Sequence, residues 1–268
     1  MLEDGYNTDY IYSLLVALFY SSSENVNFLL NIDTSDPNVY YVQEFIKLKF
    51  AYKIQHNVSI DAPIVNKFRI FIHHCGWLNN TDIMGEPNIN DLYLFLFSGM
   101  MGYNIEFTLN ENKVIDTIKF PYIHITNATI NGIPGMNDKI INLSDTINKW
   151  INQNVTYNKK YKCHFREIPR LLAIFVDIKS EQTKENIKLI NIMFSIQIND
   201  ISCDATWNVH SLICQDKNKL HYAITYSDNK WIAFSDKVKP SNSVIDMAHI
   251  PTVNKIMKEV VFVFYALQ

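Results

Sequence analysis

Paired cysteines, long apolar runs and glycine are scarce in this sequence of 268 residues. It has four cysteines, none in the Cys-x-x-Cys pair typical of structural zinc sites, so we expect free thiols, no metal and no cofactor. No apolar run approaches the roughly 18–20 residues of a membrane span, and no basic segment precedes one as in a signal peptide. We therefore expect no membrane span and no secretion, but an intracellular protein or a component of a viral particle.

Strongly basic tracts are also missing. The formal net charge is −3, and no block of Lys and Arg appears, which argues against nucleic acid as the main partner. Hydrophobic residues make up 48% of the chain, which is enough for a large core. Only seven glycines beside many Asn, Ile, Lys and Tyr residues suggest an AT-rich coding genome, such as that of a large DNA virus or of some protists.

The stretch from Asp4 to Leu30 combines a polar turn with an apolar segment. Leu14–Phe19 is apolar on every side, which predicts the start of a buried helix. The turn Gly5–Asp9 leads into the amino end of this helix, where the helix dipole stabilises a thiolate or a carboxylate. We therefore expect Asp9 to cap N–H groups of the helix.

Helical spacing of apolar residues predicts further helices at Tyr40–Ala51 and Asp91–Met100. In the first of these, four residues share or border one apolar face: Tyr41, Phe45, Leu48 and Ala51. A third helix is predicted at Ile141–Val155, with Ser144 as its N-cap and Trp150 on its buried side.

From Gly102 onward the apolar period changes to two, which predicts strands. These strands are Tyr103–Leu109, Lys113–Lys119, Tyr122–Thr126, the segments around 194–198 and 207–213, and Glu259–Leu267. The near-continuous apolar run Leu171–Ile178 predicts a central strand, whereas Asn66–His74, after Pro63, suits either a strand or a helical turn. Without repeats or linkers, we predict one α+β domain over 1–268, helical in 1–100 and mainly β in 101–268.

A β-hairpin is predicted near the carboxyl end, with strands at Leu220–Tyr226 and Lys230–Val238. Cross-strand pairing can bring a polar side chain of the second strand beside His221 on the first. Such a pair suits a catalytic base and the group that orients it.

Three segments resemble the signatures of ubiquitin-specific proteases, papain-like cysteine peptidases that cut ubiquitin from its conjugates. Asn7–Phe19 is similar to the nucleophile box Asn-Thr-Cys-Tyr-x-Asn-Ser-x-x-x-x-Leu-Phe. Asp91–Phe97 resembles the helix Gln-Asp-Ala-x-Glu-Phe-Leu, and Leu220–Val238 resembles the Gly-His-Tyr strand and the Trp-x-x-Phe-(Asn/Asp)-Asp strand after it. The resemblance implies a papain-like α+β fold with a helical thumb, a β-sheet palm and shortened, zinc-free fingers.

The same resemblance shows where this sequence departs from the active enzymes. Asp9 stands at the position of the catalytic cysteine, and Asp4 replaces the usual oxyanion-stabilising Asn, where a carboxylate would repel the developing charge. Ser235 stands at the position of the base-orienting Asn or Asp, and Asp236, which matches the next family residue, is a partial substitute. Of the four catalytic roles, only that of His221 keeps its expected residue, so these positions are interpreted as vestigial.

Two other residues were weighed as nucleophiles. Ser13 lies one helical turn beyond Asp9, where packing or capping is the simpler interpretation. Cys75 follows His73 and His74 directly, but neighbours in sequence do not define a catalytic geometry. Neither is favoured.

The sequence thus predicts a catalytically inactive relative, a pseudoenzyme, with a structural or protein-interaction role, for example in a viral particle. In this case a protein partner is expected. An alternative is a domain that binds ubiquitin or a ubiquitin-like tail between Asp9 and His221, with which Asp9 forms an ion pair. A third is an active hydrolase with a rearranged site.

Overall fold

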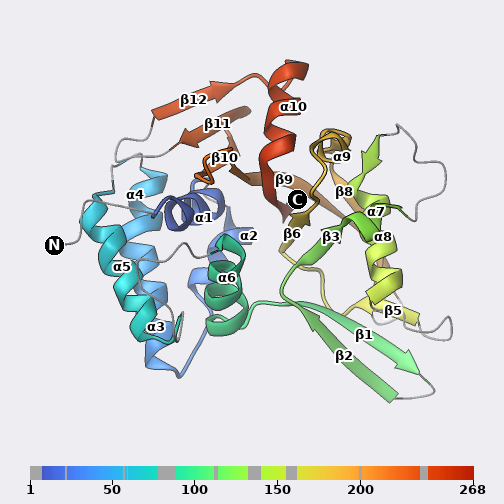
Figure 1. Cartoon of the computed structure of the whole chain (residues 1–268). Helices are drawn as coiled ribbons and strands as arrows, with labels where there is room; N and C mark the ends of the chain where they lie inside the picture. Colours follow the sequence, from blue (N-terminus) through green and yellow to red (C-terminus); the bar gives the residue numbers. More distant parts are fainter. Residues whose placement is uncertain are drawn as a thin grey trace. The chain divides into compact units, whose positions relative to one another are not determined.

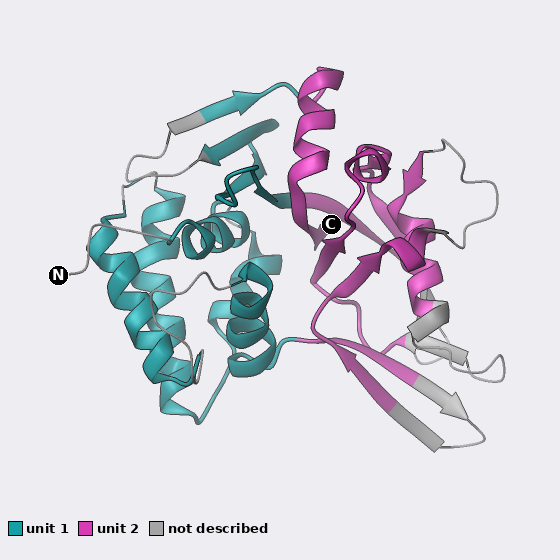
Figure 2. Cartoon of the chain, viewed as in Figure 1, with its two compact units in different colours: residues 1–103, 211–246 teal, residues 104–210, 247–268 magenta. Residues whose placement is uncertain are grey.

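The computed structural model describes residues 8–21, 23–56, 58, 60–77, 88–111, 114–131, 140–154, 162–198, 201–235 and 241–268 (Figure 1). The chain forms two compact units (Figure 2). Unit 1 comprises residues 1–103 and 211–246, and unit 2 comprises residues 104–210 and 247–268. Both candidate site residues with described side chains, Asp9 and His221, belong to unit 1.

The amino-terminal part of unit 1 is helical. Its elements are α1 (Asp9–Phe19), α2 (Glu24–Asn27), η1 (Phe28–Leu30), α3 (Pro37–Phe45), η2 (Ile46–Ala51), α4 (Tyr52–Gln55), α5 (Ala62–His74), α6 (Ile89–Tyr93) and η3 (Leu94–Met100). Every residue from Leu14 to Phe19 is fully buried, which confirms the predicted buried helix. The helix predicted at Asp91–Met100 is confirmed by α6 and η3.

The helix predicted at Tyr40–Ala51 forms, as α3 and the π-helical turn η2, but only half of its predicted apolar face is covered. Phe45 packs against Phe68 of α5, with the ring centroids 5.3 Å apart, and Ala51 is 4% exposed. Tyr41 is 60% exposed and Leu48 is 59% exposed. Phe50, which the prediction left out, is fully buried and also packs against Phe68, at 5.2 Å. Spacing alone therefore did not identify which side chains α5 covers.

Two local details of the helices resolve or correct the sequence interpretation. The ambiguous segment Asn66–His74 is helical, because Pro63 lies in the first turn of α5, where its missing N–H costs no hydrogen bond. In α8 (Leu143–Asn154), Asn142 rather than Ser144 is the cap, since its Oδ1 accepts the N–H of Ser144 at 2.9 Å.

The carboxyl-terminal part of unit 1 is a sheet. Its strands are β10 (His221–Ser227), β11 (Lys230–Ser235), β12 (Ser241–Ile245) and the last five residues of β9 (Ile201–Gln215), in the order β12-β11-β10-β9. All neighbouring strands are antiparallel. Asp228 and Asn229 at the hairpin turn have φ angles of 50° and 60°, as a type I′ turn requires, which confirms the predicted hairpin. Helix α1 packs against β10.

Unit 2 is mainly β. Its strands are β1 (Ile105–Glu111), β2 (Val114–Phe120), β3 (Ile123–Thr126), β4 (Ile141–Asn142), β5 (Lys162–Phe165), β6 (Leu171–Asp177), β7 (Ile187–Lys188), β8 (Ile192–Ile198), β9 as far as His210, and β13 (Val260–Leu267). Its helices are α7 (Asn127–Asn131), α8, α9 (Glu181–Glu185) and α10 (Ile250–Glu259). Strand β6 lies between β3 and β13, which confirms the predicted central strand.

Candidate functional site

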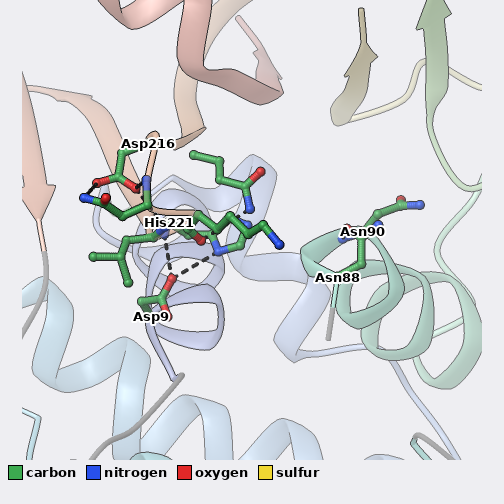
Figure 3. Close-up of polar contacts among 9 residues, drawn as sticks. Asp9, Asn88, Asn90, Asp216 and His221 are labelled. Atoms are coloured by element: carbon green, nitrogen blue, oxygen red, sulfur yellow. Dashed lines mark hydrogen bonds and ion pairs between the residues drawn. The ribbon is translucent and has the colours of Figure 1, made fainter. Parts of the chain in front are cut away.

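Asp9 and His221, 212 residues apart in the sequence, are in direct contact (Figure 3). Asp9 is the first residue of α1, and His221 is the first residue of β10. The Asp9 Oδ2 atom accepts the backbone N–H of His221 at 2.6 Å and lies 3.1 Å from Nδ1 of the imidazole. Both side chains are largely buried, with 12% and 10% of their surfaces exposed. The predicted contact between these two side chains is therefore present, with the spacing of an ion pair when the imidazole is protonated.

This environment changes the acidity of Asp9. Burial alone would raise its pKa, but the hydrogen bonds from the ring and backbone of His221, together with the charge of His221, outweigh burial and lower the pKa below its ordinary value. Asp9 is therefore ionised at neutral pH.

Asp9 also differs from the predicted helix cap. Among the described residues, its carboxylate accepts hydrogen bonds from His221 on β10, beside one from the N–H of Asp9 itself, and the N-cap residue Thr8 makes no side-chain cap bond. The carboxylate thus joins a helix to a strand. Its place at the start of α1 still benefits from the helix dipole.

The turn before His221 is held by a residue that the sequence interpretation missed. The Asp216 Oδ1 atom accepts the N–H groups of Asn218 at 2.8 Å and Leu220 at 2.9 Å. Lys219 within this turn has a φ angle of 63°, which is unfavourable for a residue with a side chain. The Asp-x-Asn pattern at 216–218 is the signal that would have identified such a turn. Asp216 therefore positions the amino end of β10 and, with it, His221.

We expect Asp216→Ala to lower the free energy of unfolding by about 1 kcal/mol, because two backbone N–H groups lose their acceptor. The measurement is urea denaturation followed by circular dichroism. Asp33→Ala, the same change at an exposed position outside the helices and strands, is the matched control. Equal losses in the two variants would contradict the positioning role of Asp216.

At three of the predicted site positions the structure describes no side chain. Ser235 is the last residue of β11 and pairs with Ser241 of β12, but its side chain is outside the described residues. Asp4 and Asp236 also lie outside the described residues. Their assignment to the site stays a prediction.

The two alternative nucleophiles are poorly placed for catalysis. Ser13 is 1% exposed within α1. Cys75 lies at the carboxyl end of α5, where burial and the nearby charge of Asp36 raise the pKa of its thiol. A raised pKa is the opposite of what activates a cysteine nucleophile.

Neither a metal-binding cluster nor a membrane-spanning helix is found among the described residues. Within residues 8–268, apart from the gaps given above, no group of three or more His, Cys, Asp or Glu side chains is arranged to hold a metal ion. No helix among these residues has the length and apolar character needed to span a bilayer.

Comparison with solved structures shows that the chain has a ubiquitin-hydrolase-like fold. In particular, the chain is similar to the Saccharomyces cerevisiae PAN2 pseudoubiquitin-hydrolase, with a TM-score of 0.56 and 11% identity over 96% of this chain and 84% of that one. It is also similar to the Saccharomyces cerevisiae Pan2 pseudoubiquitin hydrolase-RNA exonuclease module in complex with A7 RNA, with a TM-score of 0.60 and 11% identity over 99% of this chain. The chain spans 53% of that module.

These similarities confirm the predicted α+β, papain-like fold. No family model matches the chain. No curated protein matches it in sequence either.

Proposed function

We propose that this chain is a catalytically inactive ubiquitin-hydrolase-like domain with a protein-interaction role. The observation that carries the proposal is the ionised Asp9 carboxylate, bound by His221 at the start of α1. In a Cys–His pair, the thiol gives its proton to the imidazole and becomes the nucleophile. Asp9 has no proton to give at neutral pH, so this step has no counterpart here. A carboxylate that attacked an amide would form a mixed anhydride, a poor intermediate for amide cleavage.

The structural neighbours support this proposal at the level of the fold. The similar domain of Pan2 is itself described as a pseudoubiquitin hydrolase. The alternative, a domain that binds ubiquitin or a ubiquitin-like tail, is supported by His221, which stays at the start of an intact hairpin beside α1. A hydrolase with a rearranged site is the third possibility, and neither Ser13 nor Cys75 favours it.

Hydrolysis of a ubiquitin substrate with a fluorophore at its carboxyl terminus tests the proposal. We expect no release of fluorophore by the wild-type chain, because the site holds no thiolate. Turnover by the wild-type chain that His221→Ala abolishes would contradict the proposal and favour the rearranged hydrolase.

The Asp9→Cys variant separates the two non-catalytic roles. If it gains turnover that a second change, His221→Ala, removes, the site still recognises ubiquitin and the ubiquitin-binding role is favoured. If it stays inactive while folded, as judged by circular dichroism, the interaction role is favoured.

Two further predictions concern partners and location. The Pan2 module in the comparison is in complex with RNA, whereas we expect the present chain to bind no nucleic acid, because it lacks a block of Lys and Arg. Titration of fluorescent oligoadenylate checks this directly.

A place in a viral particle is a prediction from composition alone, and co-purification with particles would check it.

A further inference from the structure

Three large side chains of unit 1 form an exposed line along one helical segment. Tyr41 of α3 is 60% exposed, Leu48 of η2 is 59% exposed and Tyr52 of α4 is 60% exposed. Leu48 and Tyr52 are four residues, about one helical turn, apart, and Tyr41 lies seven residues, about two turns, before Leu48, with Glu44 on the turn between them. The three side chains thus lie near one face over about 16 Å. We call this set the Tyr–Leu–Tyr stripe. It includes two members of the apolar face that the sequence predicted, and the structure leaves both uncovered.

Neighbouring rings widen the stripe at both ends. Tyr40 is 53% exposed and contacts Tyr41, with the ring centroids 5.7 Å apart. At the other end, His56 packs against Tyr52 with a centroid distance of 4.3 Å. The opposite face of the same helical segment packs against α5 through Phe50. The exposed side chains therefore stand on a firmly packed support, which favours a recognition surface.

The charge around the stripe differs in sign from that of the chain as a whole. From the N-cap Asp36 to His56 the segment contains three lysines (Lys47, Lys49 and Lys53) and two acidic residues, Asp36 and Glu44, although the whole chain carries −3. Lys47 forms an ion pair with Glu44 at 2.8 Å, and Lys49 is exposed. The apolar Tyr–Leu–Tyr stripe, with lysines beside it, is complementary to a partner surface that is apolar and acidic.

We propose that the Tyr–Leu–Tyr stripe docks an acidic amphipathic helix of a partner protein. This inference rests on the proposed interaction role and names the surface and the chemistry of the partner. A straight line of apolar side chains on one helix complements the apolar face of a second helix, and acidic side chains beside that face meet Lys49. Single-stranded nucleic acid fits less well, because Leu48 at the centre offers no ring for a base and Glu44 engages Lys47.

The test is fluorescence anisotropy with two labelled peptides of about 18 residues, long enough to form a helix. Both have leucines at helical spacing, and the remaining positions are mainly Glu in one peptide and Lys in the other. We expect the acidic peptide to bind and the basic one not to bind. Leu48→Glu should weaken binding of the acidic peptide at least tenfold, and Tyr52→Ala should weaken it in the same direction. Val244→Glu, at a 68% exposed apolar position on β12, should leave it unchanged.

Several results would overturn this inference. They are equal binding of both peptides, no binding of either, no effect of Leu48→Glu, or binding of labelled oligoadenylate that Leu48→Glu abolishes, which would assign the stripe to nucleic acid. The Asp9→Cys hydrolysis experiment is independent of the stripe. A failed peptide test with an inactive wild-type chain would therefore reject the docking site alone, whereas wild-type hydrolysis would reject the proposed function.

Discussion

Truncation of Trp207 to alanine is expected to lower the free energy of unfolding by about 3–5 kcal/mol, the largest stability loss that we predict for this chain. The indole of Trp207 is fully buried in unit 2, and its Nε1 donates a hydrogen bond to the backbone oxygen of Pro169 at 2.6 Å. Its rings lie 6.3 Å from Phe165 and 5.9 Å from Phe194, measured between centroids. The change to alanine leaves a cavity among these rings and removes the donor to a carbonyl group.

Urea denaturation followed by far-UV circular dichroism measures this loss. Trp207→Phe keeps an aromatic ring in the core but removes the N–H donor, so its loss should be smaller, about 1–3 kcal/mol. Trp231→Ala, at a partly exposed position on β11, makes the same chemical change with an expected loss of about 1 kcal/mol. If Trp207→Ala costs no more than Trp231→Ala, the indole of Trp207 is not a main core contact of unit 2.

The fold was predictable wherever a local sequence pattern favours one local structure. The all-round apolar run Leu14–Phe19 predicted a buried helix, and the two strand segments on either side of Asp228 and Asn229 predicted a hairpin. The helix after Asp36 was different, because Phe45 of its predicted apolar face packs against α5 whereas Tyr41 and Leu48 are exposed. Which of these side chains is covered depends on packing against α5, a tertiary effect that residue spacing does not contain.

In the candidate site, the contact between Asp9 and His221 was predictable, whereas the assignments of Asp4, Ser235 and Asp236 stay predictions. The motif order brought Asp9 and His221 together, and the structure confirms this contact. The bond from Asp9 to the backbone N–H of His221 depends on how α1 lies against β10, which no local pattern specifies. Asp216 was missed for a different reason. Its turn signal is present in the sequence, but the signal does not show that the turn fixes the amino end of β10, which depends on the bond from Asp216 to Leu220.

Replacement of Asp9 by asparagine is expected to destabilise the chain by about 1–3 kcal/mol at pH 7, because a charged acceptor of two hydrogen bonds from His221 is lost. The effect should depend on pH in one direction. The pKa of Asp9 is lower in the folded chain than its unfolded value of about 3.9, so its stabilisation is complete above that value. The stabilisation is lost as the pH falls through the lower, folded pKa. The wild-type chain and Asp9→Asn should therefore become equally stable in strong acid.

Urea denaturation of both chains between pH 7 and pH 2 measures this difference. A double-mutant cycle with His221→Ala isolates the side-chain part, since Asp9→Asn should cost less when the imidazole is already absent. All four chains keep the backbone N–H of residue 221. The hydrogen bond from this N–H to residue 9 is therefore common to them and serves as the reference against which the side-chain part is measured. A stability difference that grows on acidification would mean that burial dominates and raises the pKa of Asp9. In that case the carboxylate would not be the ionised partner of His221 on which the proposed inactivity rests.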